Sequence, residues 1–281
     1  MCLCDQETFT NDAFSHLTNL VSLNVEFCKL TDDAFRHLTN LRSLNMDKCN
    51  QQTITDDAFC HLTNLQSLDL SHCDQDTITV TAFRHLRNLQ SLVMTEQTIT
   101  DDAFRHLTNL KSLAIETCNQ ITDDAFQHFP NLRSLNMHWC NQEAITDDAF
   151  RHLTNLQSLD MSLCNQKAIT VVAFQHFTNL QSLNMTFCDQ RTITDDAFRH
   201  LTNLQSLVMS YCDQKTITDD AFRHLRKLQY LEMSYCKQGT ITDEAFRHLT
   251  NLQFLEMKLR NQETITSRAF LHLKNLQSLI I

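Results

Sequence analysis

The apolar positions of this chain recur in one fixed arrangement from end to end. Each copy begins with L-x-x-L-x followed by an apolar residue, most often Met, as at Leu204, Leu207 and Met209. The alternating end of that pattern predicts a short strand. A polar segment follows, and then Thr-Asp-Asp-Ala-Phe-Arg-His-Leu, in which Ala221, Phe222 and Leu225 form one apolar stripe of a short helix. The Phe of the Ala-Phe pair marks the twelve copies: Phe14, Phe35, Phe59, Phe83, Phe104, Phe126, Phe150, Phe174, Phe198, Phe222, Phe246 and Phe270.

Successive copies are 21, 24, 24, 21 and 22 residues apart, and then 24 throughout. A period of this size with Leu at fixed offsets is typical of a solenoid, in which each coil contacts only its neighbours. Stacking the coils would place the strands about 4.8 Å apart in a parallel sheet. The sequence therefore predicts an α/β fold of about twelve coils of 21–24 residues. Because no linker interrupts the repeat, we expect a single domain over residues 1–281, with partial coils at both ends.

The polar residues of a coil indicate where its helix begins and ends. Thr218 is a suitable N-cap, and Asp219 and Asp220 follow it near the positive end of the helix dipole. Asn203 ends the preceding helix, and Asn holds that place in eleven copies. Since Asn is the residue that best replaces Gly in a left-handed C-terminal position, we expect it to adopt that conformation.

Composition excludes several classes of site. The chain has one glycine and one proline in 281 residues. Phosphate-cradling loops, the nucleophile elbow and calcium loops all need glycine where the backbone turns sharply, so none of these motifs is present. Ser, His and Asp recur in every coil without a distinctive trio in any one, so we expect no enzyme activity and no cofactor.

The net charge and the N-terminal residues indicate which classes of partner and which cellular location to expect. The formal net charge of −10 disfavours nucleic acid and anionic membranes, and it suits a basic protein partner. No apolar run approaches the roughly 18 residues of a membrane span. Met1-Cys-Leu-Cys lacks the basic and apolar regions of an export signal, so we expect a cytoplasmic location, with delivery into a host cell as the alternative.

The motif L-x-x-L-x-M-x-x-C followed by Ile-Thr-Asp resembles the cysteine-containing class of leucine-rich repeats, known from the repeat arms of F-box proteins. The match covers essentially the whole chain. It implies a curved, horseshoe-shaped solenoid with short helices outside and a concave sheet that binds other proteins. The Ala-Phe pair also resembles repeats of bacterial surface proteins. No F-box precedes the repeats, which argues against a direct ubiquitin-ligase role.

Two columns of chemically active side chains run along the repeat. Cysteines follow the strands at 4, 28, 49, 73, 118, 140, 164, 188, 212 and 236. In the resembled class this thiol is buried and bonds to the backbone of the turn. Because neighbouring columns about 5 Å apart do not converge four ligands on one ion, we expect no zinc site. Cys2 and Cys60 lie outside this column, and Cys60 replaces a helical Arg, so we expect it to be exposed.

Histidines at the Phe+2 position form the second column, on the helix side. Asp220 precedes His224 by four residues, and the histidine lies near a helix C-terminus. Both features favour imidazolium, so we expect a structural role for these histidines, and a metal array or a pH sensor is the alternative. If the contacts raise the pKa of the histidines in the folded state, their stabilisation is complete below about pH 6.5.

The copies differ most beside the strands, and a bound partner would contact those positions. The residue before the cysteine is large and apolar or aromatic in five consecutive coils. We expect one row beside these residues, made of His138, Asp160, Asn184, Val208, Glu232 and Glu256. Tyr230 and Phe254 replace an otherwise constant Ser. Exposed aromatic residues edged by acids resemble an interface hot spot. The alternative is that the aromatic row only stacks on itself. The candidate partner-binding residues, within 136–256, are Trp139, His138, Asp160, Leu163, Phe187, Tyr211, Tyr230, Glu232, Tyr235, Phe254 and Glu256.

The sequence therefore predicts a non-catalytic protein–protein interaction scaffold whose concave face binds its partner. Two alternatives remain open. The chain could be the substrate-recognition adaptor of a ubiquitin ligase, with the F-box in another chain. It could instead be a structural repeat protein that associates end to end through its uncapped C-terminal coil.

Overall fold

The computed structural model describes residues 11–26, 30–49, 52–73, 76–95, 99–117, 120–141, 143–188, 191–213, 215–236, 239–258 and 264–281. Cys2, Cys4, Cys28 and Cys118 lie outside these ranges. The chain forms two compact units, Met1–Leu132 and Arg133–Ile281, which are described separately. The prediction of one domain over residues 1–281 stays a prediction.

In each unit a short strand alternates with a short helix, and most of the helices are 3-10 helices (η). The first unit contains η1 Asn11–Phe14, β1 Ser22–Asn24, η2 Asp32–Phe35, β2 Ser43–Asn45, η3 Asp56–Phe59, β3 Ser67–Leu70, η4 Ala82–His85, β4 Ser91–Thr95, η5 Asp101–His106, β5 Ser112–Glu116 and α1 Asp123–Phe126. The second contains β6 Ser134–Asn136, η6 Asp147–Phe150, β7 Ser158–Asp160, α2 Val171–Phe174, β8 Ser182–Asn184, α3 Asp195–Phe198, β9 Ser206–Val208, η7 Asp219–His224, β10 Tyr230–Glu232, η8 Asp243–His248, β11 Phe254–Glu256, η9 Ser267–His272 and β12 Ser278–Ile280.

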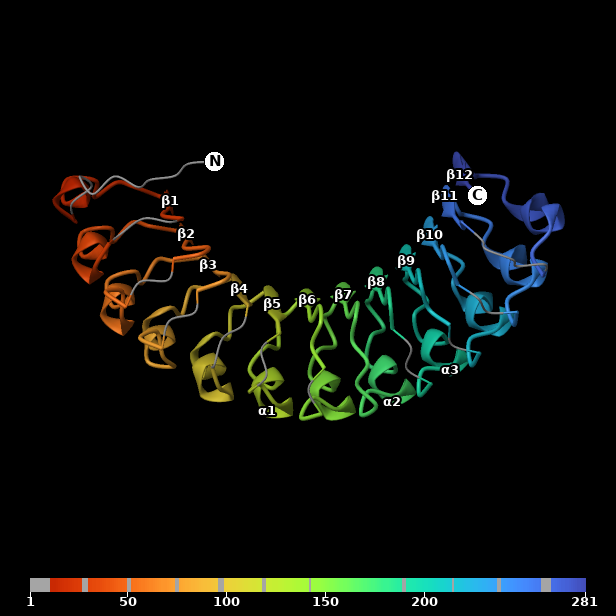
Figure 1. Cartoon of the computed structure of the whole chain (residues 1–281), viewed down its shortest axis with the longest axis horizontal. Coiled ribbons are helices and arrows are strands. Elements are labelled where there is room, and N and C mark those ends of the chain that lie inside the picture. The colour runs from red at the N-terminus through yellow and green to blue at the C-terminus, as the bar shows by residue number, and fades with distance from the viewer. Residues whose placement is uncertain are drawn as a thin grey trace. The chain divides into compact units, whose positions relative to one another are not determined.

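Within each unit the strands form a parallel sheet in sequence order, and the helices lie on the opposite side of the coils (Figure 1). Equivalent residues of successive coils are paired, as in Ser43 with Ser67 and Leu207 with Leu231. The predicted solenoid of stacked strand–helix coils is therefore confirmed.

The core is built from the repeated apolar positions. In the coils between the first and the last, the Ala-Phe pair, the strand leucines and the apolar residue two positions after each strand leucine, which is Met in most coils, are almost completely buried. In the second unit Phe177 replaces a leucine and packs edge to face against Phe150, with ring centroids 5.4 Å apart, and against Phe174. Because each coil buries this set only against its neighbours, the coils stabilise one another.

Threonine caps most of the helices, as predicted, and in several coils it also links the coil to the preceding one. Thr218 accepts a hydrogen bond from the backbone N–H of Asp220, which is the N-cap contact. Its own N–H and hydroxyl donate to the two carboxylate oxygens of Asp195 in the coil before, both over 2.7 Å. The first Asp of the Asp-Asp pair therefore acts mainly between coils.

This aspartate–threonine contact is lost where another residue replaces the first Asp of the preceding coil. Val80 and Val171 replace the first Asp in two coils. In the coils that follow them, Thr100 and Thr194 make no side-chain cap hydrogen bond. The Val substitutions thus remove a specific inter-coil contact.

The predicted role of the asparagine is wrong. No asparagine of the described ranges has a positive φ. Instead the side chain reaches back one coil, where Asn203 Nδ2 donates to the carbonyl oxygen of Thr178 over 2.8 Å. The left-handed residues are those before the cysteine, and they include Lys48 at φ 58° and Trp139 at φ 56°. The turn after each strand therefore forms without glycine.

Candidate functional site

The candidate residues before the cysteines share one backbone geometry in the second unit. Trp139, Leu163, Phe187, Tyr211 and Tyr235 have φ between 56° and 60°. Each backbone N–H donates to a carbonyl of the next coil, as Tyr211 does to Ser234 over 2.9 Å. Lys48, His72 and Thr117 adopt the same conformation in the first unit. The fold therefore fixes the left-handed turn, but it does not require an aromatic side chain there.

These five residues, which we call the aromatic column, run along one end of the strands. Phe187 and Tyr211 are stacked with ring centroids 4.3 Å apart and an interplanar angle of 12°, and Tyr211 and Tyr235 are stacked at 4.7 Å and 23°. Trp139 remains 59% exposed, Phe187 44% and Tyr211 45%, whereas Leu163 and Tyr235 are half-buried. Stacking and exposure occur together, so ring edges of the stack face solvent.

The cysteine that follows each of these residues lies in the core. Cys188 Sγ donates to the carbonyl oxygen of Met161 over 2.8 Å, and Cys73, Cys164, Cys212 and Cys236 make the equivalent bond. Burial raises the pKa of Cys188 and Cys236 to about 12. The buried, backbone-bonded thiol is therefore confirmed for these cysteines, and it anchors the turn that carries the aromatic column.

A second set of candidates projects from the strands themselves. Asp160, Glu232 and Glu256 are half-buried, and the sheet register aligns Asn136, Asp160, Asn184, Val208, Glu232 and Glu256 in one row. His138 was predicted beside this row, but it lies two residues further along, in line with Ser162, to whose Oγ its Nδ1 is 2.8 Å. The residue that shares the row with Asp160 is Asn136, so the predicted row mixed two columns.

The third set is the pair Tyr230 and Phe254. These residues begin β10 and β11 side by side, and their rings are stacked with centroids 4.4 Å apart and an interplanar angle of 2°. Serine occupies the same position in the flanking strands, at Ser206 and Ser278. The pair therefore stands between two small side chains.

Hydrogen bonds orient the acids between the two aromatic sets. Glu232 accepts from Ser210 Oγ over 2.9 Å and from the Tyr230 hydroxyl over 3.2 Å. Glu256 accepts from Ser234 Oγ over 3.4 Å and forms an ion pair with Lys258 over 2.8 Å. Desolvation, followed by the charge of Glu232, raises the pKa of Tyr230. Ser210, Ser234 and Lys258 were not among the predicted residues, although the two serines directly precede Tyr211 and Tyr235, and Lys258 holds the place of the serine in the next coil.

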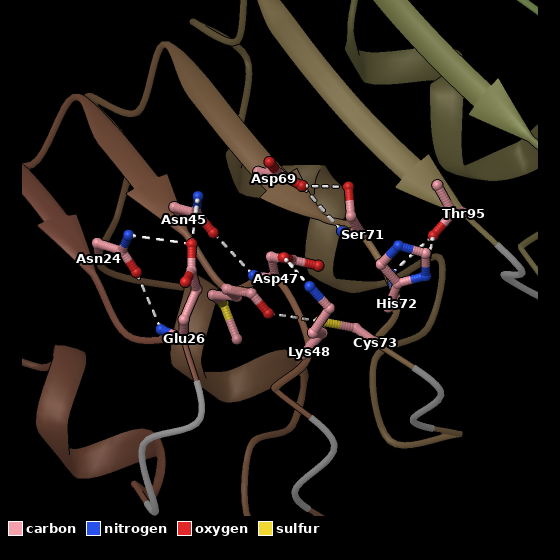
Figure 2. A network of polar contacts seen from close by, with 11 residues as sticks. Asn24, Glu26, Asn45, Asp47, Lys48, Asp69, Ser71, His72, Cys73 and Thr95 are labelled. Atoms are coloured by element: carbon pink, nitrogen blue, oxygen red, sulfur yellow. Dashed lines mark hydrogen bonds and ion pairs between the residues drawn. The ribbon is translucent and has the colours of Figure 1, made fainter. Parts of the chain in front are cut away.

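Several equivalent positions of the first unit carry polar side chains instead, although Val93 and Ala114 hold the place of the acids in two strands. Figure 2 shows Asn24 and Asn45 directed at the Glu26 carboxylate and Ser71 bonded to Asp69. His72 and Lys48 occupy the places that Trp139 and Tyr211 occupy in the second unit. An aromatic surface is therefore a property of particular coils and not of the repeat.

On the helix side the predicted imidazolium is not supported. Desolvation lowers the pKa of His224, and the charges of Arg223, Arg199 and Arg226 lower it further, while Asp220 opposes them. Arg223 Nε donates to His224 Nε2 over 3.0 Å, which requires a neutral acceptor nitrogen. The neighbouring arginines therefore outweigh the aspartate, and the predicted raised pKa is wrong for this histidine.

No group of three or more His, Cys, Asp or Glu side chains in the described ranges is arranged to hold a metal ion. No helix of those ranges is both long and apolar enough to cross a membrane.

Solved structures with the same fold cover most of this chain. A TLR13–ssRNA13 complex matches 97% of it and 45% of the other chain, at 24% identity and a TM-score of 0.71. The Drosophila Toll–Spatzle complex matches 97% of this chain and 40% of the other, at 19% identity and a TM-score of 0.72. An internalin, InlF of Listeria monocytogenes, matches 95% of this chain and 76% of its own chain, at 23% identity and a TM-score of 0.69. The chain thus spans less than half the length of the first two.

Sequence comparison gives the family. No curated protein sequence matches the chain. The family model described as BspA type leucine rich repeat region matches residues 76–188 and 167–281, and two further leucine-rich repeat models match residues 29–74 and 64–86. The first model alone covers more than half of the chain, so the protein belongs to the leucine-rich repeat family.

Proposed function

We propose that this chain is a non-catalytic scaffold that binds a partner protein on the exposed face of the β6–β12 sheet. The observation that carries the proposal is the stack of Phe187 on Tyr211, which leaves both residues more than 40% exposed. A packing role alone would not require aromatic residues, because Lys48 and Thr117 hold the same backbone position elsewhere in the chain.

The physical mechanism is burial of a preformed surface. The aromatic column is fixed by backbone hydrogen bonds, by the buried thiols and by ring stacking. Binding would therefore order little of the scaffold itself, and the partner would gain the free energy of covering rigid aromatic side chains.

Charge favours a protein over a nucleic acid as the partner. The neighbours differ in this respect, since one is a complex of Toll with Spatzle and another a complex of TLR13 with an RNA. Affinity for nucleic acid comes largely from Lys and Arg on phosphates. The chain carries a net charge of −10, and Asp160, Glu232 and Glu256 lie on the candidate face. This face would repel phosphates.

The test is capture of partners by matched variants. Native protein and a Phe187→Thr/Tyr211→Thr variant are immobilised and exposed to lysate of the source cells, and bound proteins are quantified by mass spectrometry. Thr117 already adopts the required backbone at φ 54°, so the variant should fold, which circular dichroism checks. A Val172→Asp variant on the helix side is the control, because Asp is the repeat's usual residue there. Proteins retained by native and control but lost by the double variant support the proposal; equal capture by all three contradicts it.

A further inference from the structure

The pair Tyr230 and Phe254 is placed to receive a side chain from outside the protein. Each ring uses one face for the other ring, at a centroid distance of 4.4 Å. The outer faces border Ser206 and Ser278, which are in register with the pair on either side. A serine is much shorter than an aromatic ring, so it covers less of the outer face than a third ring would, and both Tyr230 and Phe254 stay half-buried.

The carboxylate beside Tyr230 forms no ion pair with another described residue. Glu232 projects from the same strand two residues later, on the same face of the sheet. It receives neutral hydrogen bonds from Ser210 and Tyr230. None of the five ion pairs among the described residues includes Glu232.

The next coil contains an internal example of the missing contact. Glu256 occupies the register position of Glu232 in the neighbouring strand. There the ammonium group of Lys258 lies 2.8 Å from the carboxylate, and the pKa of Lys258 is raised by that hydrogen bond and charge. The residue equivalent to Lys258 in the coil of Glu232 is Ser234, which carries no charge. Lys258 is thus paired with Glu256 and interacts with Glu232 only through its charge, so the Glu232 carboxylate has no ion pair of its own among the described residues.

We infer that the partner protein inserts an arginine or lysine side chain between the outer face of Tyr230 and the carboxylate of Glu232. A cation over an aromatic ring is attracted by the ring quadrupole, and a guanidinium can at the same time donate two hydrogen bonds to one carboxylate. This inference rests on the proposed function, and it names the chemistry of the partner at one end of the same face.

The probe is a fluorescein-labelled octa-arginine peptide, and the matched peptide contains citrulline, which has the shape of arginine without its charge. Affinity is measured by fluorescence anisotropy for the native protein and three variants. Tyr230→Ser/Phe254→Ser and Glu232→Asn introduce residues that the same rows already contain at Ser206 and Asn184, so the fold should persist. Glu244→Gln removes an equal charge from an exposed position on the helix side.

We expect octa-arginine to bind the native protein and the citrulline peptide to bind at least tenfold more weakly. Each of the two site variants should weaken octa-arginine about tenfold, and Glu244→Gln less than twofold, because a partly desolvated charge contact contributes more than an exposed one. Equal losses in all three variants would show general attraction to an acidic protein and would overturn the inference, as would absence of binding to the native protein.

The same variants, tested for both peptide binding and protein capture, distinguish failure of this inference from failure of the proposed function. If the Phe187→Thr/Tyr211→Thr variant loses its captured proteins while the Tyr230 and Glu232 variants keep both those proteins and the peptide, the face binds proteins without this cation contact. If the peptide depends on Glu232 but no captured protein depends on Phe187 and Tyr211, the cation site exists and the wider binding face does not.

Discussion

Thr218 and Asp195 belong to consecutive coils, and both oxygens of the Asp195 carboxylate accept hydrogen bonds from the threonine, one from its N–H and one from its hydroxyl, each over 2.7 Å. The same threonine caps its own helix through the Asp220 N–H. One side chain thus satisfies a helix end and connects two coils.

Thr218→Ala should lower the free energy of unfolding by about 2 kcal/mol, because it removes an N-cap and a hydrogen bond to a charged group. Thr194→Ala is the matched control, since Val171 in the preceding coil offers no carboxylate and Thr194 makes no side-chain cap bond. Chemical denaturation followed by circular dichroism measures both. A similar loss in the two variants would mean that the inter-coil bond adds no stability.

Lys48→Gly should raise the free energy of unfolding by about 0.5–1 kcal/mol. Lys48 has φ 58°, which an L-residue adopts at a cost and glycine adopts freely. Lys227 does not have a positive φ, so Lys227→Gly should instead be destabilising, because glycine increases the entropy of the unfolded chain. Thermal unfolding of both variants under one buffer condition distinguishes them. Destabilisation by Lys48→Gly would contradict the left-handed turn.

Acidification should destabilise the helix side of the second unit. The pKa of His224 is lowered in the folded protein, first by desolvation and then by the surrounding arginines. The unfolded chain therefore binds protons more readily, and stability that is complete above about pH 6.5 is lost as the pH falls through and below that value.

The measurement is a proton NMR titration of His224 together with denaturation midpoints at pH 7.5 and 5.5. Arg223→Gln removes the nearest opposing charge, so it should raise the pKa of His224 and reduce the loss of stability on acidification. A His224 pKa above that of a free histidine in the native protein would refute this account.

The cysteines should react unequally with iodoacetamide at pH 8. Cys188 and Cys236 are buried thiols with pKa values of about 12, whereas Cys60 is only half-buried. Since the thiolate is the reactive form, Cys60 should be alkylated many times faster in the folded protein. Peptide mass spectrometry measures each rate, with unfolded protein as the reference. Equal rates in the folded protein would mean that the cysteine column opens readily.

The repeat period and the apolar spacing were sufficient to predict the strands, the helices and the core. Residues equivalent to Phe222 and Leu207 recur in every coil, and stacking the coils buries them against the same positions of the neighbouring coils. The left-handed turn was assigned to Asn203 because bulky residues such as Tyr211 rarely adopt that conformation on their own. Here the hydrogen bond from the Tyr211 N–H to the next coil stabilises the left-handed conformation. The conformational preferences of residues within one coil do not predict that bond.

The sequence was enough to predict which residues form the candidate site, but not how they align between neighbouring coils. The aromatic residues and acids were identified because they differ between coils, but His138 was placed beside Asp160 when its true neighbour is Ser162. The signal for the aspartate–threonine contact was present in the sequence, since the first Asp of one coil and the Thr of the next recur together. The loss of this contact at Thr194 was also predictable, because Val171 replaces the aspartate of the preceding coil.

The central claim is that a partner covers the aromatic column, and the single tryptophan of the chain reports on it directly. Trp139 is 59% exposed and begins that column in the second unit. Iodide quenching of its fluorescence is measured for the free protein and for the complex with a protein captured in the experiment above. We expect the quenching constant to fall severalfold in the complex, because the partner shields the indole. An unchanged constant in a fully formed complex would place the partner elsewhere and contradict the account.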